Sequence, residues 1–524
     1  MPKLVSVSQT VAIEQAQVNL GVSMRQLMLN AGAGVAEIIR RSSESAEGSK
    51  KVISLVGKGN NGGDALVALR DLAFEGWHGT ALIFGQRSTS DPLVKAVRGL
   101  GCEVVYFSNG ETDSLEKIFS GEPAVIDGIL GTGFRLPLSE ELASAMNWVR
   151  EVIKRQKCQV FSVDCPSGTN CDTGECAEDA LDADVTVCMA AVKKGLLIFP
   201  AAAKTGKIET VDIGITEDNP EWQDISDFVA DEAMLKSLLP PRPLNSHKGM
   251  FGKIMVCGGC LEYPGAPILN GCGAYAVGAG LVRVASTEYS MQGYSGRLIE
   301  AIWLRLPHTD GYLNIEGIPL LERYLMEQDV LIFGSGLGIN QTTTEFVNTF
   351  FDLVQRRKNI LARLKIVLDA DGLRMITSLN RWYEKIPSQI VITPHPGEFR
   401  AITAGMQLEG KDRLESAKIV AGEWGCVVVL KGAMTVVAAP DGRSATIPIA
   451  SPALAKAGTG DVLAGMIGGF LGQGLEGFEA AVLGAGIHAM SGEVTSTIYG
   501  NNRSIMASDI YYHANEVFSK LENV

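Results

Sequence analysis

Two series of short apolar runs, separated by longer amphipathic segments, do most to limit what this chain can fold into. The first series lies between Val52 and Ile215 and reads VISLVG, TALIFG, EVVYF, AVIDGILG, VFSVD, DVTVCM and IETVDIG. Segments between the runs, such as Ser139 to Lys157, have helical periodicity. This alternation predicts an α/β fold with a parallel, doubly wound sheet. Residues 9–44, before the series, have a helical pattern.

A second series of apolar runs follows, reading KIMVCGG, LVRVAS, VLIFGSG, KIVLDADG, IVITPH, CVVVLKG and TVVAAPDG. The chain of 524 residues is longer than a single hydrophobic core usually serves, so we expect two domains. The acidic stretch after Ile215 and the proline-rich Leu239–Pro243 read as a linker. We therefore expect domains at 1–218 and 246–524, joined by a linker at 219–245.

Composition excludes several classes of protein. A net charge of -13 and a pI near 5.1 argue against a nucleic-acid surface, which needs clustered Lys and Arg. The N-terminus MPKLVSVSQTVAIEQ lacks the pattern of a secretory signal, so we expect a cytoplasmic protein. The longest uncharged stretch, Tyr263–Val282, contains two prolines and five glycines, so we expect no membrane span. The ten cysteines read as buried or free thiols, and the lone Cys257–Cys260 pair reads as packing.

The stretch GKGNNGGD at 57–64 directly follows an apolar run. Glycines there expose backbone N–H groups, which α/β proteins use to hold phosphates. The spacing matches neither GxGxxG nor GxxxxGK[ST], so a tight turn without a ligand stays an alternative.

Polar residues follow several predicted strands of the first series: Asn60, Asn61 and Asp64, then Asp127, then Asp164 with Ser167. The carboxyl ends of parallel strands face one crevice, so these side chains should converge. Their oxygens suit an alkali or alkaline-earth cation. Loop capping is the alternative for each residue taken alone.

In the second series, the loop AGTGDVLAG at 457–465 runs into an apolar segment. Such a loop presents backbone N–H groups at the positive end of a helix, which suits a phosphoryl group in transfer. Asp461 could accept the proton of an attacking hydroxyl, or could simply cap the helix.

Other polar residues follow the remaining strands of the second series. Lys431–Thr435 could lie against a nucleotide, and Asp369, Asp371 and Glu398 could bind magnesium directly or through water. His395 is the most suggestive of the six histidines, with a structural role, bonded to backbone, as the alternative.

Taken together these motifs resemble one known family. GKGNNGGDALVALR, VIDGILGTGF, VDCPSGTNCDTG and TVCMAAVKKGL resemble the epimerase domain of bifunctional NAD(P)H-hydrate repair enzymes. HKGMFGKIMVCGG, YPGAPILNGCGAYAVGAGLVRVA, FGSGLG, VLDADGL, ITPHPGEF, VLKGAMT and AKAGTGDVLAG resemble the family's ribokinase-like dehydratase domain. The motifs occur in the family's order and span almost the whole chain.

The resemblance implies a function. Hydration at C6 of the reduced nicotinamide ring gives R and S forms that dehydrogenases cannot use. The family's epimerase interconverts them, and its dehydratase restores the S form by phosphorylating the C6 hydroxyl and eliminating phosphate. The resemblance implies K⁺ in the epimerase domain, Mg²⁺, ADP in preference to ATP as phosphoryl donor, and a homo-oligomer. It implies no nucleic-acid or membrane partner.

The resemblance also assigns residues by motif. The potassium ligands are Asn61, Asp127 and Ser167. In the epimerase, Asp164 is the acid or base, Lys193 matches a family lysine, and the hydrate-binding residues are Asn60, Asn61, Gly62, Gly63, Asp64, Gly131, Thr132, Gly133, Phe134, Arg135, Leu136, Pro137 and Asp164. In the dehydratase, Asp461 takes the hydroxyl proton and the hydrate contacts are Ala266, Gly336, His395 and Asp461. The nucleotide contacts are Lys431, Gly432, Ala433, Met434, Thr435 and Gly460.

The sequence departs from the family's pattern at Ser335, where proline is common, at Cys260, where serine is common, and at LMLNAG, where an acidic residue is frequent. A ribokinase-like small-alcohol kinase fused to a Rossmann-like domain is the main rival, because the GTGD loop is shared across that group. KGAMT, HPGEF and the first domain count against it. A non-catalytic nucleotide sensor is a second rival, and the intact Asp461 and its glycines count against it.

Overall fold

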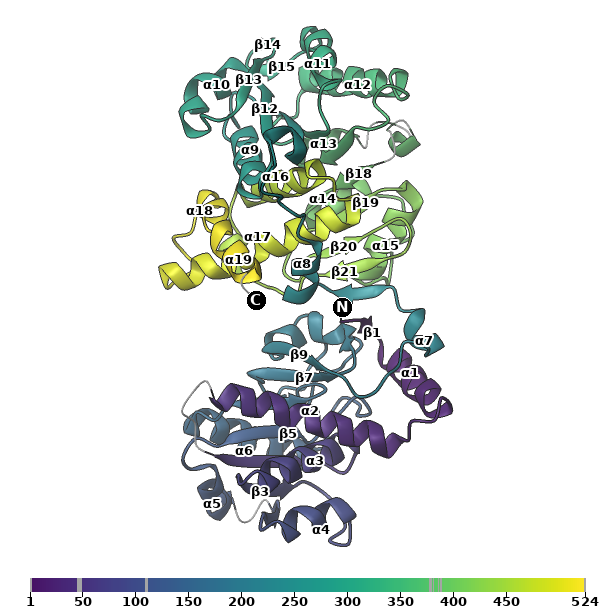
Figure 1. The fold of residues 1–524 in the computed structure, drawn as a ribbon, viewed down its shortest axis with the longest axis vertical. Helices are drawn as coiled ribbons and strands as arrows, with labels where there is room; N and C mark the ends of the chain where they lie inside the picture. Colours follow the sequence, from purple (N-terminus) through teal and green to yellow (C-terminus); the bar gives the residue numbers. More distant parts are fainter. Residues whose placement is uncertain are drawn as a thin grey trace. The chain divides into compact units, whose positions relative to one another are not determined.

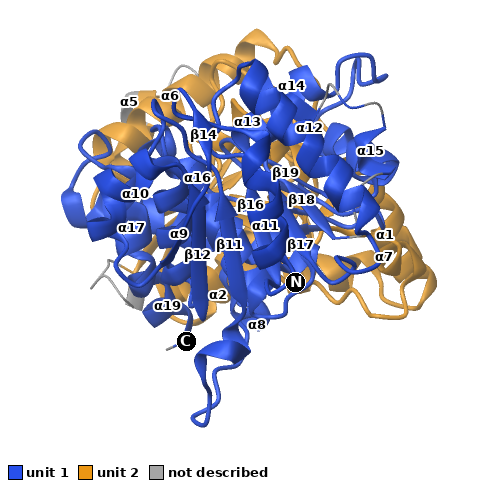
Figure 2. Ribbon diagram, turned by 90° about the horizontal axis from the view of Figure 1, so that it is seen from above, with its two compact units in different colours: residues 1, 228–524 blue, residues 2–227 orange. Residues whose placement is uncertain are grey.

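The computed structural model describes residues 2–44, 50–108, 112–376, 379, 381–384, 386 and 389–522. The chain divides into two compact units, Pro2–Asp227 and Phe228–Val524, coloured separately in Figure 2. We call them the N-terminal unit and the C-terminal unit and describe each by itself.

The N-terminal unit is built on a seven-stranded parallel sheet with strand order β4-β3-β2-β5-β6-β7-β9. Each apolar run of the first series contains one of these strands. They are β2 (Lys51–Val56), β3 (His78–Ile83), β4 (Glu103–Tyr106), β5 (Ala124–Gly128), β6 (Val160–Val163), β7 (Val185–Met189) and β9 (Lys207–Val211). The order reverses between β2 and β5, as in a Rossmann-like sheet, which confirms the predicted fold class.

Helices cover both faces of this sheet. One core joins the sheet to α2 (Met24–Glu44), α3 (Asn60–Phe74) and α4 (Pro92–Gly99), and a second joins the other face to α6 (Glu140–Gln156). The long helix α2 is labelled in Figure 1, where it is purple like α1. The expected helical stretch 9–44 is two helices, α1 (Val7–Asn19) and α2, because Gly21 with φ +104° ends the first. The short α5 is Thr112–Leu115.

A two-stranded parallel sheet stands apart from the main one. It pairs β1 (Leu4–Val5) with β8 (Val192–Lys193) and places Val5 opposite Lys193. The sequence analysis missed this pairing because strands of two residues show no periodicity. The pairing holds the N-terminal segment next to Lys193, a residue of the candidate site described below.

The C-terminal unit is built on a ten-stranded sheet with order β10-β21-β20-β19-β18-β17-β16-β11-β12-β13. Along this order, the neighbouring pairs from β19 through β18, β17, β16, β11 and β12 to β13 are parallel, whereas β19–β20 and β20–β21 are antiparallel. A separate antiparallel pair joins β14 to β15. Each run of the second series contains a strand: β11 (Lys253–Cys257), β12 (Leu281–Ser286), β16 (Val330–Phe333), β17 (Lys365–Leu368), β18 (Ile390–Ile392), β19 (Val427–Leu430) and β20 (Val436–Ala438). The shorter strands β10 (Asp227–Val229), β13 (Ile302–Arg305), β14 (His308–Thr309), β15 (Tyr312–Leu313) and β21 (Ser444–Thr446) lie outside those runs.

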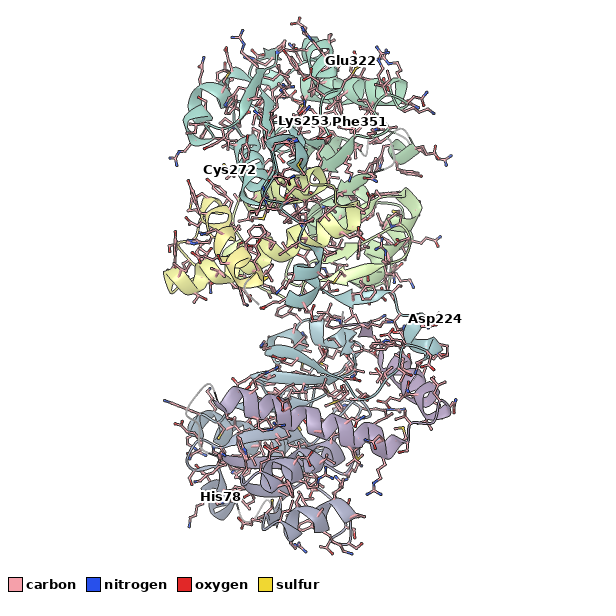
Figure 3. The ribbon with its side chains drawn as sticks, viewed as in Figure 1. His78, Asp224, Lys253, Cys272, Glu322 and Phe351 are labelled. Atoms are coloured by element: carbon pink, nitrogen blue, oxygen red, sulfur yellow. The ribbon has the colours of Figure 1, made fainter. Side chains whose placement is uncertain are left out.

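Helices pack around this sheet as the α/β prediction requires. They are α9 (Ala266–Ala276), α10 (Glu288–Tyr294), α11 (Ile318–Leu325), α12 (Gln341–Arg356), α13 (Ala370–Ile376), α14 (Pro396–Ile402), α15 (Arg413–Trp424), α16 (Thr459–Gly472), α17 (Gly477–Tyr499), α18 (Ala507–Tyr512) and α19 (Ala514–Glu522). One large core contains residues of α9, α16 and α17, including Cys272, which Figure 3 labels. On α12, Phe350 stacks on Phe333 of β16 with ring centroids 4.6 Å apart.

The expected linker, residues 219–245, contains ordered elements. It includes α7 (Pro220–Gln223), strand β10 and α8 (Glu232–Leu238), and the two units divide at Asp227. Strand β10 lies beside β21, and the Ala230 N–H donates to the Thr446 carbonyl at 3.0 Å. The polar composition of this stretch reflects a sheet edge and exposed helix faces.

Candidate active sites

The strand order of the N-terminal unit places its candidate site at the reversal between β2 and β5. Neighbouring registers pair Val56 with Gly128 and Asp127 with Ser162, so the ends of β2, β5 and β6 lie together. Ligands of open α/β sheets bind outside the carboxyl ends of the strands at this point. The polar residues that the sequence places after these strands are therefore brought to one edge.

The glycine loop after β2 packs too closely for side chains. A Cβ on Gly57 would overlap the Ile129 carbonyl, and a Cβ on Gly62 would overlap the Gly57 carbonyl. The structure places Asn60–Asp64 at the start of α3, where the N–H groups of Asn60–Gly62 lack helical partners, while Gly63 N–H donates to the Gly59 carbonyl at 3.3 Å. Arg87, which sequence reasoning missed, donates from Nη1 to the Gly57 carbonyl at 2.9 Å. Its position just after β3 was the available signal.

Asp127 lies at the centre of a buried polar cluster. Its carboxylate accepts hydrogen bonds from Ser162 Oγ at 2.9 Å, from Ser167 N at 2.8 Å and from Ser167 Oγ at 2.5 Å. Burial raises the pKa of Asp127, and the hydrogen bonds from Ser167 and Ser162 oppose that rise. Among the described residues no Lys, Arg or His forms an ion pair with it.

Asn61 reaches the same place from α3. Its Nδ2 donates to the Val163 carbonyl at 2.6 Å, and its side chain packs directly against Gly131. Ser167 Oγ also accepts from Leu130 N at 2.8 Å, one residue before Gly131. Asn61, Asp127 and Ser167 therefore surround the start of the loop after β5. A buried carboxylate without a basic partner, next to amide and hydroxyl oxygens, fits a monovalent cation.

The remaining predicted residues of that loop extend away from this cluster. Gly131 contacts Asn61, and Thr132–Arg135 continue through the turn. Leu136 and Pro137 line a surface hollow together with Ala143, Glu175–Asp179 and Pro200.

Asp164 and Lys193 form a buried ion pair. Asp164 follows β6 with φ +66°, and its Oδ1 accepts from Met189 N at 3.0 Å and from Lys193 Nζ. Lys193 is fully buried. Burial alone would lower the pKa of Lys193, but the charge of Asp164 outweighs it and the pKa is raised. A non-glycine residue held at positive φ is strained, and such strain concentrates at functional sites.

Two further carboxyls lie near this pair. Asp64 is 8% exposed, and its pKa is raised well above the usual value by burial and by the charges of Asp164 and Glu14. Burial also raises the pKa of Glu14 on α1. Sequence reasoning missed Glu14 because its helix is brought to the site by the β1–β8 pairing, which no sequence pattern announces.

The C-terminal unit places its candidate site at the start of α16. Gly458, with φ +90°, precedes the helix, and Asp461 lies in the first turn. A Cβ on Gly465 would overlap the Asn270 carbonyl, so α16 and α9 are in backbone contact. Asn270 Nδ2 donates to the Asp461 carbonyl at 2.8 Å. The loop that should hold a phosphoryl group is therefore fixed from α9.

Asp461 is a carboxyl that can hold a proton near neutral pH. Burial and the charge of Asp369 raise the pKa of Asp461 to about 8, while Lys431 and a hydrogen bond from Ser335 oppose that rise. A pKa near the working pH suits a group that accepts a proton during reaction.

Lys431 is the positive centre of this site. Its Nζ donates to Asp369 Oδ1 at 2.9 Å and lies 4.0 Å from Glu398 Oε2. Asp369 also accepts from Thr393 Oγ1 at 2.7 Å and from Ser335 Oγ at 3.2 Å. Asp369 and Glu398, two of the three carboxylates that the sequence suggests for magnesium, both face Lys431.

The segment Lys431–Thr435 forms a tight turn with unusual backbone. Gly432 and Met434 have φ of +146° and +53°. The Arg413 guanidinium donates to the carbonyls of Ala433, Leu430 and Lys431 at 2.9 to 3.1 Å. A Cβ on Gly460 would lie 3.2 Å from Lys431 Nζ, so the two predicted nucleotide contacts are adjacent. Arg413 was missed, because its position at the start of a helix gave no signal.

The predicted hydrate contacts occupy two places. A Cβ on Gly336, whose φ is +66°, would lie 2.8 Å from Ala266 Cβ, so these residues adjoin. His395 is half-exposed and caps α14, with Nδ1 accepting from Gly397 N at 3.0 Å and Glu398 N at 3.3 Å. The backbone role foreseen as an alternative for His395 is thus present, and its exposed ring stays available to a ligand.

The described residues contain neither a side-chain cluster for a metal ion nor a helix that could span a membrane. No three or more His, Cys, Asp or Glu side chains in those ranges are arranged to hold a metal ion. Within the same ranges, every helix is too short or too polar to cross a bilayer.

Two protein families match separate parts of the chain. Residues 24–195 match the family described as YjeF-related protein N-terminus, and residues 254–511 match the family described as NAD(P)H-hydrate dehydratase. A solved structure of an ADP/ATP-dependent NAD(P)H-hydrate dehydratase from Bacillus subtilis, co-crystallised with ATP and Mg²⁺, is 27% identical with a TM-score of 0.46. It covers 56% of this chain and 98% of its own.

Whole-length relatives settle the family. A bifunctional NAD(P)H-hydrate repair enzyme of Moorella thermoacetica is 34% identical over 510 residues, 95% of this chain and 92% of the relative. One of Salinibacter ruber is 32% identical over 517 residues, 94% of this chain and 91% of the relative. The chain belongs to the family of bifunctional NAD(P)H-hydrate repair enzymes.

Proposed function

We propose that this chain repairs hydrated NADH and NADPH, with an epimerase in the N-terminal unit and a dehydratase in the C-terminal unit. Family membership over nearly the whole chain supports both activities. The single structural observation that carries the proposal is Asp461, a carboxyl with its pKa raised to about 8 at the start of α16. We propose ADP as the phosphoryl donor in preference to ATP.

The dehydratase step follows from the geometry around Asp461. Asp461 accepts the proton of the C6 hydroxyl as that oxygen attacks the terminal phosphorus of the nucleotide. Backbone N–H groups of Gly458–Gly460 and the positive charge of Lys431 stabilise the phosphoryl group in transfer. Phosphorylation makes the C6 oxygen part of a good leaving group, and the ring nitrogen lone pair then breaks the C6–O bond and expels phosphate. Loss of a proton from C5 to water forms the C5=C6 double bond of the dihydronicotinamide. Ala266, Gly336 and His395 orient the hydrate, and Lys431–Thr435 with Gly460 contact the nucleotide.

Among the described residues of this unit, no three or more His, Cys, Asp or Glu side chains are arranged to hold a metal ion. Mg²⁺ would enter with the nucleotide phosphates, and Asp369, Asp371 and Glu398 are the carboxylates that would hold it, directly or through water.

In the epimerase step, Asp164 gives a proton to the C6 hydroxyl as the ring nitrogen lone pair breaks the C6–O bond and water leaves, and it then takes a proton from the water that adds to the other face of C6. Lys193 and the Met189 N–H fix its carboxylate. Asn60–Asp64 and Gly131–Pro137 bind the coenzyme hydrate, with the glycine loop at its phosphates. Asn61, Asp127 and Ser167 fit K⁺, which would balance the charge of Asp127 beside the coenzyme.

The test is recovery of dihydronicotinamide absorbance from a mixture of R and S NADH hydrate, with Mg²⁺ and K⁺, using ADP, ATP or no nucleotide. We expect full recovery with ADP. Recovery that stops when the S form is consumed would mean an inactive epimerase, and no recovery with either nucleotide would favour the small-alcohol kinase. We also propose a homo-oligomer, which sedimentation equilibrium would test.

A further inference from the structure

A polar cluster in the C-terminal unit is left unused by this function. Tyr312 Oη donates to Oε1 of Glu262, and Cys260 Sγ donates to Oε2 at 3.3 Å. These hydrogen bonds lower the pKa of Glu262, so the exposed carboxyl is ionised at neutral pH. No basic side chain of the described residues pairs with Glu262.

The backbone holds this cluster in place. Tyr312 lies on the hairpin of β14 and β15, whose turn contains Asp310 at φ +51° and Gly311 at φ +87°. The Leu261 N–H donates to the Gly311 carbonyl at 3.0 Å, which ties the turn to the segment that carries Glu262. The carboxylate of Glu262 therefore has a fixed direction although it is exposed.

Helix α9 connects this cluster to Asp461. Asn270 on α9 donates to the Asp461 carbonyl at 2.8 Å. Ala266 lies four residues earlier, about 6 Å along the helix axis. Glu262 precedes Ala266 by another four residues. The chain thus runs from the proposed site of chemistry, past a proposed hydrate contact, to Glu262.

The loop Gly334–Gly338 connects the same two points independently. Ser335 hydrogen-bonds Asp461 at one end of it. A Cβ on Gly338, at the other end, would lie 2.7 Å from the Tyr312 ring and 3.2 Å from Cys260 Sγ. Gly336 between them adjoins Ala266. A ligand anchored at Asp461 and lying along Ala266 and Gly336 would therefore be directed toward Glu262.

We propose that Glu262, held by Tyr312, makes the dehydratase prefer hydrated NADH over hydrated NADPH. This inference rests on the proposed function. With the C6 hydroxyl at Asp461, the rest of the dinucleotide extends along Ala266 and Gly336. A carboxylate at the far end accepts hydrogen bonds from the adenosine ribose hydroxyls, as acidic residues do in NAD-binding folds. The same charge repels the 2′-phosphate of the NADPH form.

The size of the preference follows from solvent screening. Glu262 is exposed, so a phosphate carrying about -1.5 to -2 charges a few ångströms away is repelled through a high dielectric. We expect a preference of about tenfold in kcat/KM, which decreases as ionic strength rises.

The experiment compares kcat/KM for the S hydrates of NADH and NADPH at low and high ionic strength, in the wild type and in Glu262→Gln. Glu262→Gln should lower the ratio of the two values by about fivefold or more, and Glu262→Arg should invert the preference. Tyr312→Phe, which frees the carboxylate, should lower the ratio to a smaller extent. Glu316→Gln, which removes an exposed charge shortly after the same hairpin, is the matched control and should leave the ratio unchanged.

The outcomes separate this inference from the proposed function. If the wild type dehydrates neither hydrate, the proposed function fails. If it dehydrates both and the ratio is the same in wild type, Glu262→Gln and Glu262→Arg, the inference is overturned while the function stands. Equal thermal unfolding of wild type and variants shows that a changed ratio reflects recognition.

Discussion

Each unit holds an aspartate–lysine pair at the carboxyl end of its sheet, buried in the N-terminal unit and part-buried in the C-terminal unit, and the two lysines contact aspartates with different proposed roles. In the N-terminal unit, Lys193 donates to Asp164, the proposed acid or base. In the C-terminal unit, Lys431 donates to Asp369. It acts on the proposed base Asp461 only through its charge, which lowers the pKa of that carboxyl. In both, a second carboxyl has a raised pKa: Asp64 in the first and Asp461 in the second.

In both units, one lysine beside two carboxyls leaves one carboxyl paired and the other with a raised pKa. In each unit the lysine ammonium contacts one aspartate directly. Burial and the negative charge of that aspartate raise the pKa of a neighbouring carboxyl, Asp64 or Asp461, which can then hold a proton. If the two sites were analogous in chemistry as well as in electrostatics, Asp64 would share the acid–base work with Asp164. Variants of the paired and unpaired carboxyls measure how far the analogy extends.

The largest effect is expected from Asp461→Asn. An amide cannot accept the hydroxyl proton, so dehydration should fall by about a thousandfold or more. Exchange between R and S hydrates should be unchanged, because it belongs to the other unit. The two rates are measured on one preparation by absorbance recovery and by chromatography of the epimers. Loss of both rates would contradict the assignment of one activity to each unit.

The next effect concerns the buried pair Asp164–Lys193. Lys193→Met leaves Asp164 without its buried partner and should lower the free energy of unfolding of the N-terminal unit by about 3–5 kcal/mol. Lys204→Met is the matched control, since its partner Asp182 is mostly exposed, with side-chain exposures of 21% and 63% for Lys204 and Asp182. That variant should cost less than about 1 kcal/mol. Urea unfolding measures both, and equal losses would mean that burial of the pair has no energetic consequence.

The fold was more predictable from the sequence than the sites were. Each predicted apolar run contains a strand, because strands buried on both faces of a parallel sheet need continuous apolar residues. The short strands β1, β8, β14 and β15 have only two residues each, too few for any periodicity, and they place Lys193 and Tyr312.

Within the sites, sequence reasoning predicted which strand ends carry polar residues, and Asp127, Ser167 and Asn61 do lie together. It could not predict which partner each charge takes. Lys431 faces Asp369, and Arg87 and Arg413 bind carbonyls of the two loops. Those pairings depend on distances between loops far apart in sequence, so local patterns carry no trace of them.

A third prediction uses the pH dependence of the dehydration rate to test the raised pKa of Asp461. Because a base must be deprotonated, the rate of dehydration should rise as pH increases through about 8, the pKa of Asp461. The charge of Lys431 lowers this pKa, so Lys431→Met should shift the rising limb to higher pH. The measurement is kcat against pH at saturating hydrate and ADP. An unshifted limb would mean that another group controls it.

The same raised pKa predicts a dependence of stability on pH. A folded-state pKa raised from the ordinary 3.8 to about 8 contributes stability below the ordinary value, which is lost as pH rises through about 8. Asp461→Asn removes this loss, so the C-terminal unit of the variant should unfold at a higher temperature than wild type above pH 8. The difference should shrink toward pH 4. Calorimetry across that range measures it, and a constant difference would contradict the raised pKa.

The smallest effect is expected at Ser335. Its hydroxyl donates to Asp369 Oδ2 at 3.2 Å, and its hydrogen bond to Asp461 lowers the pKa of that carboxyl. Ser335→Ala removes one such bond, worth about 1 kcal/mol, so the pKa of Asp461 should rise by a few tenths to about one unit. The limb of the pH profile should therefore move in the same direction as in Lys431→Met but less far. A movement to lower pH would show that the Ser335 hydroxyl stabilises the protonated form of Asp461. Asp461 would then act as a hydrogen-bond donor rather than as a base.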